Sequence, residues 1–390
     1  MTIDIASVRA DTPACDSLIH FNNAGASLSP RCVTDAVFDH LRLEQQIGGY
    51  EAANAASTAL ENFYHAFARM LHCEASEIAF AENATHAWNN LFGAVPLAQG
   101  DRILTGQSEY ASNYLSFLHL AKRRGVIIEV IPNTPEGVLD VDKLEAAVRD
   151  DVKLIAITHV PSQSGVVHPA AEVGKIARRH GILYLLDACQ SAGQIELDVR
   201  TLGCDMLTGT GRKYLRGPRG TGFLYIRRQA LERLEPAWVD LHSAQWIAEN
   251  EYRLRADARR FENWECFVAG KIGLGVAVNY ALKIGLAQIE ARVAALARTL
   301  RQSLETLPEV RVHEHGQRLS GIVTFSVQGV PAAQLQAHLQ RLSINSSVTR
   351  ADNSQLDLAH RGLGDLNRVS VHYYNTESEI ARFCEAVAGL

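Results

Sequence analysis

Two ionisable residues that each follow an apolar run, Asp187 and Lys213, could together perform cofactor chemistry. Asp187 ends the run 183–186, and Lys213 lies in a glycine-flanked turn that follows the run 205–208. A lysine amine can form a Schiff base with a carbonyl compound, and a carboxylate can pair with a protonated pyridine nitrogen. Pyridoxal phosphate needs both groups, so the pair indicates a site for this cofactor. Taken singly, each residue has an ordinary explanation, as a helix cap and as a solvated lysine.

Short apolar runs that alternate with helical patterns must position these two residues. The run before Asp187 is wholly apolar, which is typical of a strand buried on both faces of a parallel sheet. Similar runs occur upstream at 78–80, 102–105, 126–131 and 154–158. We therefore predict an α/β fold with a mainly parallel sheet covered on both faces. Such sheets bind ligands outside the carboxyl ends of their strands, where Asp187 would lie.

The pattern changes near residue 282, where a long amphipathic helix is followed by shorter strands and helices. We predict a large domain over residues 17–281 and a smaller C-terminal α+β domain over 282–390, on which residues 1–16 pack. At 390 residues the chain is long enough for both domains. The apolar window 272–286 contains polar residues and is too short to span a membrane, so we predict a buried helix there.

A loop of small residues at 82–85 precedes a helical pattern that begins at His86. Thr85 supplies a hydroxyl, and a helix N-terminus supplies free backbone N–H groups and a dipole that favours an anion. The loop is therefore a candidate phosphate site, although by itself an ordinary helix cap is the simpler explanation.

Composition and charge narrow the range of partners. The formal net charge of −5 gives no basic surface for nucleic acid or an anionic membrane. The seven cysteines are dispersed without C-x-x-C spacing, which argues for reduced thiols in the cytoplasm and against a disulfide framework or a metal site. The N-terminus lacks the apolar core of a secretory signal. We expect a cytoplasmic protein that binds a small molecule.

The most specific motif is D-x-x-Q followed by a G-x-K turn, here Asp187, Gln190 and residues 211–213. With this motif the chain resembles the class V aminotransferase family of fold-type-I pyridoxal phosphate enzymes, which includes cysteine desulfurases, isopenicillin N epimerase-like proteins and kynureninase. The resemblance extends from Asn22 almost to the C-terminus, with the motifs in the same order. It implies a large domain with a seven-stranded, mainly parallel sheet, and a homodimer with its active site at the subunit interface.

The resemblance implies a catalytic set of Lys213, Asp187 and Tyr110. Lys213 would hold the cofactor as a Schiff base and move the α-proton, Asp187 would bind the pyridine nitrogen, and Gln190 the phenolic oxygen. Tyr110 stands where cysteine desulfurases have a histidine against the cofactor ring, and an aromatic ring can stack there. Ser162 stands near the ring where many relatives have asparagine. The implied phosphate contacts are Ala84, Thr85, Thr210 and Arg212.

The resemblance also implies contacts to an amino-acid substrate. Arg368 matches the family's arginine that binds the substrate carboxylate, and Asn23 and Gly25 are implied to contact the substrate as well. The segment 261–265 would extend toward the neighbouring subunit's site.

One departure from the family pattern bears on the reaction. Cysteine desulfurases carry a cysteine on a mobile loop that takes up sulfur, and the corresponding segment here, 345–354, has none. This departure argues against a desulfurase that forms a persulfide in the usual way. The short leader and the IGGYEAA segment at 47–53 resemble the ergothioneine-type C–S lyase branch.

We therefore expect a pyridoxal phosphate-dependent enzyme that acts on an α-amino acid by β-elimination with C–S cleavage. An aminotransferase or an epimerase could be built from the same residues. A NAD(P)-dependent oxidoreductase is a more distant alternative, because Gly209 and Gly211 follow a strand but the third glycine of that fingerprint is missing. A relative that binds the cofactor in a structural or regulatory role is a further alternative, against which Lys213 and Arg368 count.

Overall fold

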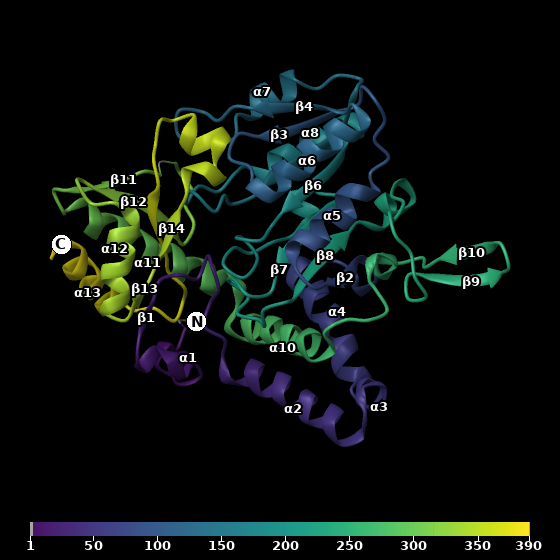
Figure 1. The fold of residues 1–390 in the computed structure, drawn as a ribbon, viewed down its shortest axis with the longest axis horizontal. Coiled ribbons are helices and arrows are strands. Elements are labelled where there is room, and N and C mark those ends of the chain that lie inside the picture. Colours follow the sequence, from purple (N-terminus) through teal and green to yellow (C-terminus); the bar gives the residue numbers. More distant parts are fainter. Residues whose placement is uncertain (1–2, 315, 390) are drawn as a thin grey trace.

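Two units make up the molecule, one built around a seven-stranded sheet and the other around a four-stranded sheet (Figure 1). The computed structural model describes residues 3–314 and 316–389. Residues 1–2, 315 and 390, which belong to the predicted leader and small domain, lie outside the described residues. The division of the chain at 281/282 stays a prediction.

The large sheet has the strand order β2-β8-β7-β6-β5-β3-β4. The strands from β7 to β4 run parallel, whereas β8 runs antiparallel to both of its neighbours. The prediction of a mainly parallel, seven-stranded sheet is confirmed. The strands are β2 (Ile78–Ala81), β3 (Arg102–Gly106), β4 (Ile127–Ile131), β5 (Val152–Thr158), β6 (Leu183–Asp187), β7 (Met206–Thr210) and β8 (Gly222–Ile226).

Both faces of this sheet are buried, because alternate side chains pack into two separate apolar cores. Along β6, Tyr184 and Leu186 pack into one core, and Leu183 and Leu185 pack into the other. A strand buried on both faces needs apolar residues at successive positions, which explains the uninterrupted run before Asp187. The helices of this unit are α2 (Arg31–Ile47), α3 (Gly49–Ala55), α4 (Ser57–Leu71), α5 (Ala84–Ala94), α6 (Ala111–Arg124), α7 (Val141–Ala146), α8 (Ala170–His180), α9 (Val199–Leu202) and α10 (Val268–Ile284).

The smaller unit contains an antiparallel sheet in the order β11-β12-β15-β14. A short strand near the N-terminus, β1 (Ile19–His20), pairs in parallel with β13 (Ile344–Asn345). Phe21 packs in the apolar core of this unit, so the residues after the leader lie with the small unit, although they fall within the predicted large domain. The other elements are α11 (Leu286–Glu305), β11 (Val310–Val312), β12 (Ile322–Val327), α12 (Ala332–Arg341), β14 (Ser347–Thr349), β15 (Leu366–Ser370) and α13 (Glu377–Ala388).

The described part of the leader contacts the small unit. Its helix α1 (Ile5–Ala10) carries Arg9, whose guanidinium lies 2.7 Å from the carboxylate of Glu379 on α13. The same guanidinium donates a hydrogen bond to the carbonyl oxygen of Tyr374 at 3.0 Å. These contacts connect the two ends of the chain.

The turn that carries Lys213 is fixed by a buried arginine, Arg216. Its backbone has a φ of 60°, a left-handed conformation that is uncommon for a residue with a side chain. Its N–H donates to the carbonyl oxygen of Lys213 at 2.9 Å. Its guanidinium donates to the Leu28 carbonyl oxygen at 2.8 Å and to the Tyr373 hydroxyl at 2.7 Å. It also lies over the ring of Tyr374, 4.6 Å from the centroid. The Lys213 turn is therefore tied to both units.

Two further features of the large unit are a projecting hairpin and a buried apolar helix. The hairpin of β9 (Ala244–Ala248) and β10 (Glu251–Leu254) projects from the rest of the molecule (Figure 1). The apolar window at 272–286 lies mostly in α10, whose side chains are largely buried. Among the described residues, no single helix is long and apolar enough to cross a membrane, and α10 and α11 reach that measure only as a pair bent by 80°.

Candidate active site

The carboxyl ends of β5, β6 and β7 meet at one pocket, which is completed by the start of α5 and by the turns around Tyr110 and Lys213. The residues that line it are Asn83, Ala84, Thr85, Tyr110, Thr158, Val160, Ser162, Asp187, Cys189, Gln190, Thr210, Arg212 and Lys213. All nine residues predicted to bind the cofactor are among them. The fold brings these residues together from distant parts of the chain, while their individual roles stay predictions.

Asp187 lies at the carboxyl end of β6 and is only 4% exposed. One carboxylate oxygen, Oδ1, accepts a hydrogen bond from the N–H of Cys189 at 2.8 Å. The other, Oδ2, accepts one from the side-chain amide of Asn113, also at 2.8 Å. Because a buried carboxylate is costly without such donors, the two bonds hold the group in place at the pocket.

Lys213 is buried beside it and is 8% exposed. Burial lowers the pKa of its ammonium group, and the nearby Arg212 acts in the same direction. Its Nζ lies 6.0 Å from the centroid of the Tyr110 ring. A lysine with a lowered pKa is more readily present as the neutral amine, which is the form that attacks a carbonyl carbon.

The start of α5 provides an anion site in the same pocket. Asn83 caps this helix with its side chain. The backbone N–H groups of Ala84 and Thr85 donate to no other group in the described part of the chain, and both residues line the pocket together with Arg212. Free N–H groups at a helix N-terminus, a hydroxyl and a guanidinium together match a phosphate group.

Strand β8 lies close behind the helix start that forms this anion site. Gly222 on β8 passes directly behind the start of α5. A Cβ at this position would lie 2.9 Å from the carbonyl carbon of Asn83 and 3.1 Å from the nitrogen of Ala84. Glycine is therefore required here for the helix start to reach the pocket.

Pyridoxal phosphate fits the groups that surround the pocket. The amine of Lys213, the carboxylate of Asp187 and the anion site at α5 match its aldehyde, its ring nitrogen and its phosphate. Gln190 also lines the pocket, and its Nε2 donates to the carbonyl oxygen of Ala24 at 3.1 Å. The buried side-chain oxygen of Gln190 has no hydrogen-bond partner among the described residues. A buried polar atom of this kind is rare in folded proteins and indicates that a further group binds beside it.

Arg368, which was predicted to bind the substrate carboxylate, lies beside the pocket and not in its lining. From β15 it donates to the carbonyl oxygen of Ser162 at 3.2 Å and to the hydroxyl of Ser347 at 3.3 Å. It forms no ion pair with a described carboxylate, and its buried Nε has no partner among the described residues. This guanidinium therefore retains the capacity to bind an anionic group next to Ser162.

Asn23 and Gly25, the other predicted substrate contacts, also lie outside the lining. The Asn23 amide donates to the carbonyl oxygen of Ser370 at 2.7 Å, and its side-chain oxygen accepts from the Tyr374 hydroxyl. The carbonyl oxygen of Gly25 accepts a hydrogen bond from Arg212. Both residues thus support the walls of the site, and direct contact with a substrate stays a prediction.

Sequence reasoning missed several polar residues of the site. Cys189 lines the pocket, and burial, with the adjacent Asp187, raises the pKa of its thiol well above the usual range. Glu109 and Asn113 lie behind Asp187. Glu109 precedes the N-cap of α6 and Asn113 lies in the first turn of that helix, and no sequence signal indicates that this turn meets Asp187.

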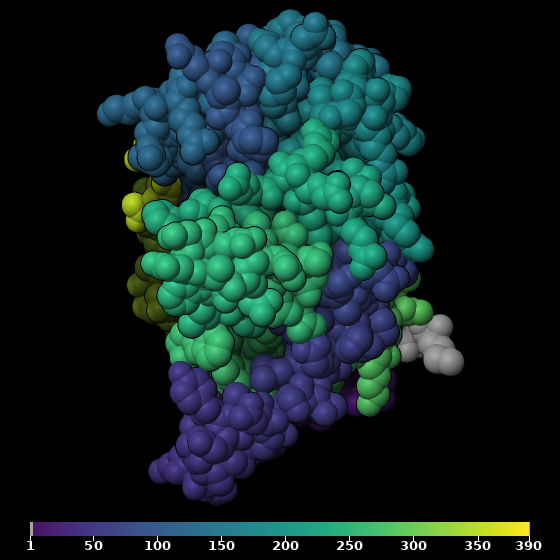
Figure 2. All heavy atoms as spheres, turned by 90° about the vertical axis from the view of Figure 1, so that its right-hand side faces the viewer, coloured from purple at the N-terminus to yellow at the C-terminus, as the bar shows by residue number. Residues whose placement is uncertain are grey.

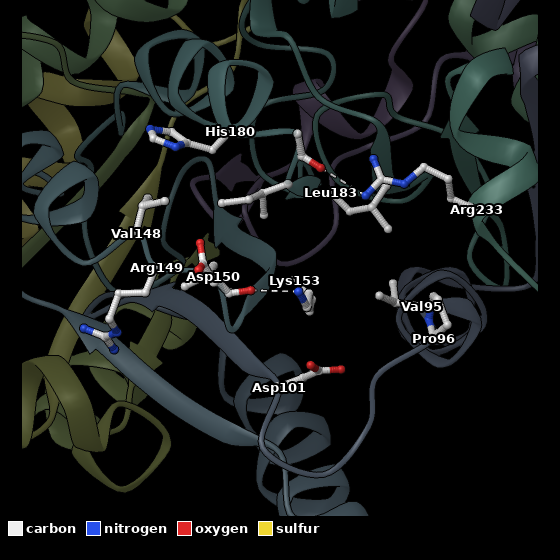
Figure 3. Close-up of a pocket in the computed structure, with 13 residues that line it drawn as sticks. Val95, Pro96, Asp101, Val148, Arg149, Asp150, Lys153, His180, Leu183 and Arg233 are labelled. Atoms are coloured by element: carbon white, nitrogen blue, oxygen red, sulfur yellow. Dashed lines mark hydrogen bonds between the residues drawn. The ribbon is translucent and has the colours of Figure 1, made fainter.

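A second pocket lies at the opposite edge of the sheet, at the amino ends of β3, β5 and β6 (Figure 3). Two of its cations bind backbone oxygens, since Lys153 donates to the Asp150 carbonyl at 2.7 Å and Arg233 to the Gly181 carbonyl at 3.1 Å. Ligands of open α/β sheets bind at the carboxyl edge. We therefore assign the active site to the pocket around Lys213.

Within residues 3–314 and 316–389, no group of three or more His, Cys, Asp or Glu side chains is arranged to hold a metal ion.

Comparisons with known proteins show the family of this chain. The family described as Aminotransferase class-V matches residues 19–383. A probable cysteine desulfurase from Methanothermobacter thermautotrophicus is 29% identical, over 98% of this chain and 98% of its own length. The apo structure of a cysteine desulfurase from Thermococcus onnurineus superposes with a TM-score of 0.93 at 29% identity, covering 100% of this chain and 98% of that one. A cystine C–S lyase in complex with its product, cysteine persulfide, shares the fold with a TM-score of 0.87 at 23% identity, covering 97% and 99%.

The fold and the pocket together define a pyridoxal phosphate-dependent enzyme of fold type I. The chain belongs to the class-V aminotransferase family, because the match covers most of its length. This membership removes the reason to consider a nicotinamide-dependent oxidoreductase.

The anion site can be tested by replacing Arg212 with methionine. We expect the Kd for pyridoxal phosphate to rise about 10- to 100-fold, because a hydrogen bond to a charged group contributes about 1.5–3 kcal/mol. The measurement is a titration of the apoprotein followed by cofactor absorbance. Arg219→Met, which changes an exposed arginine of the same turn, is the matched control and should bind as the unmodified protein does. An unchanged Kd in R212M would show that Arg212 does not bind the phosphate.

Proposed function

We propose that the protein is a pyridoxal phosphate-dependent lyase that acts on an α-amino acid and eliminates a sulfur-containing β-substituent by C–S cleavage. The observation that carries this proposal is the buried Lys213 beside Asp187 in a pocket that also contains an anion site. The relatives named as cysteine desulfurases and the fold relative named as a cystine C–S lyase support a sulfur-containing amino acid as the substrate class.

Each residue has a task that its position supports. When bound, the cofactor supplies an electron sink that weakens the bonds at the substrate α-carbon. Lys213 Nζ would hold the cofactor and move the proton at that carbon. Asp187 would keep the ring nitrogen protonated, and Tyr110 would supply an aromatic surface for the ring. Arg368 binds the substrate carboxylate and so orients the α-carbon toward Lys213.

The absence of a cysteine from segment 345–354 favours a lyase over a persulfide-forming desulfurase. Segment 345–354, which includes β14, has no cysteine. Cys189 lines the pocket, but its raised pKa leaves it as the neutral thiol near pH 7. Thiolates, and not thiols, are the effective nucleophiles toward sulfur. We infer that sulfur leaves with the product and does not remain on the protein.

We propose a homodimer whose interface includes the β9–β10 hairpin. Large apolar side chains on and around this hairpin are each more than half exposed, namely Trp238, Leu241, Trp246, Tyr252 and Trp264. Figure 2 shows the segment that carries them in the middle of one face of the molecule, with α2 and α3 projecting below. An exposed apolar cluster of this kind is typical of a protein interface. Since Trp264 lies within the segment 261–265, which is expected to extend toward a neighbouring site, a second copy of this chain is the proposed occupant.

A cytoplasmic location is also proposed. All seven cysteines are free, which is typical of proteins kept in a reducing compartment.

Product analysis tests the reaction. Holoenzyme incubated with cysteine or cystine should release pyruvate and ammonia in equal amounts, because β-elimination of such a substrate yields an unstable enamine that hydrolyses to both. Both products can be measured by coupled enzymatic assays. Stoichiometric transfer of the amino group to an added keto acid without ammonia would show an aminotransferase, and racemisation without pyruvate would show an epimerase. Either result would overturn the lyase proposal.

The role of sulfur can be tested with Cys189→Ser in the same assay. We expect the variant to keep its pyruvate and sulfur release, because the neutral thiol of Cys189 takes no part in sulfur transfer. Mass spectrometry of the unmodified protein after turnover should show no persulfide on Cys189. Loss of sulfur release in C189S together with a persulfide on Cys189 would indicate a desulfurase.

The interface can be tested by the double substitution Trp246→Glu and Tyr252→Glu. Charges on the hairpin should prevent its burial, so sedimentation velocity should change from a dimer to a monomer. Leu342→Glu, which places a charge at an exposed apolar residue of the small unit, is the control and should stay dimeric. A dimer in the double variant would place the interface elsewhere.

A further inference from the structure

Behind Asp187 lies a second buried carboxyl group, that of Glu109, which is 5% exposed. Its Oε1 accepts a hydrogen bond from the N–H of Tyr110 at 2.9 Å and another from the hydroxyl of Thr158. Its Oε2 accepts one from the hydroxyl of Thr105 at 3.1 Å. Donors from β3, β5 and the start of α6 therefore hold this carboxyl in one orientation. The roles described so far give it no task.

Asn113 on α6 joins the two carboxyl groups. Its Nδ2 donates to Glu109 Oε1 at 3.0 Å and to Asp187 Oδ2 at 2.8 Å. A side-chain amide nitrogen has two N–H donors, and here both are used on carboxyl oxygens. Because both neighbours accept hydrogen bonds, the nitrogen of Asn113, and not its oxygen, must face Asp187.

We propose that Glu109 and Asn113 are positioning residues for Asp187. Asn113 fixes the carboxylate of Asp187 in the orientation in which it would meet the ring nitrogen of the cofactor, and Glu109 fixes Asn113 by accepting a hydrogen bond from its second N–H. The proposal rests on the proposed cofactor site and not on which bond of the substrate is cleaved.

Glu109 adds an electrostatic effect to this geometry. Burial raises the pKa of Glu109 to about 7, against the opposing effect of the hydrogen bonds from Thr158 and Asn113. The charged group that it faces across Asn113 is Asp187, whose charge raises the pKa further. Above neutral pH, Glu109 therefore places a second negative charge behind Asp187. A negative charge at this position favours the protonated form of the bound cofactor.

Asn113→Ala tests the orienting bond. We expect the Kd for pyridoxal phosphate to rise about tenfold or more, because Asp187 loses a hydrogen bond to a charged group. Asn279→Ala is the matched control, since Asn279 is also a helical amide with two partners, Asn62 and Arg69, away from the pocket. If Asn113 only supports the fold, N113A will unfold at a lower temperature but bind the cofactor with unchanged Kd, and the proposal fails.

Glu109→Gln tests the charge separately from the geometry, because glutamine keeps an oxygen for Tyr110, Thr158 and Asn113. We expect near-normal cofactor affinity, but the pH midpoint of the visible absorption change of the bound cofactor should fall by about half a unit or more. Glu314→Gln, which neutralises a buried carboxylate of the small unit, should leave that midpoint unchanged.

The outcomes separate this proposal from the proposed function. If E109Q titrates at the pH of the unmodified protein, the charge of Glu109 is not coupled to the cofactor and its electrostatic effect is refuted. If the unmodified protein binds no cofactor and shows no visible absorption, the cofactor site itself is refuted. Neither readout depends on catalytic turnover.

Discussion

Asp187 and Lys213, two ionisable groups, are buried together at the carboxyl edge of one parallel sheet, and the other contacts of the site hold them in place. Asp187 and Lys213 are 4% and 8% exposed, and charges this deeply buried are costly unless hydrogen bonds or a partner compensate them. Asp187 ends β6, and the adjacent β7 leads into the turn of Lys213, so the pairing of these strands sets the distance between the two groups. Asn113 supports the carboxylate on one side, and Arg216 fixes the lysine turn on the other.

The two units meet at this pocket. Arg368 lies on a strand of the small sheet, yet it donates to the carbonyl oxygen of Ser162 in the large unit. Asn23 bonds to Ser370 on the same strand as Arg368, and Gly25 accepts from Arg212 in the lining. A substrate bound to Arg368 would therefore contact both units. The N-terminal segment, through Asn23 and Gly25, connects the two units beside this position.

The parts of the site that follow from strand endings could be predicted from the sequence. An apolar run that stops at a carboxylate indicates both the strand and the edge of the sheet at which Asp187 lies. The glycine-flanked turn after the run 205–208 likewise places Lys213 at this edge. The nine cofactor residues line one pocket because the motifs that identified them all follow strands or begin a helix. The number of strands followed only from the family resemblance, and their order was not predicted, because strand pairing depends on contacts distant in sequence.

The missed residues depend on packing between elements. Asn113, at the start of α6, reaches Asp187 at the end of β6, and Glu109 lies just before that helix. No local sequence pattern indicates this contact. Cys189 was counted among dispersed thiols, and its place in the pocket follows from its position two residues after Asp187. The β9–β10 hairpin carries exposed aromatic side chains and few core contacts, so it lacks the apolar alternation that indicates a strand in a sheet.

Reduction of the holoenzyme with borohydride, followed by mass mapping of its peptides, tests whether Lys213 binds the cofactor. We expect the reduced cofactor on Lys213 and no attached cofactor in the Lys213→Ala protein. Lys271 is a second buried lysine, 6% exposed, and serves as an internal control that should remain unmodified. Attachment at Lys271 or another lysine, or attachment that persists in K213A, would contradict the assignment of the active site.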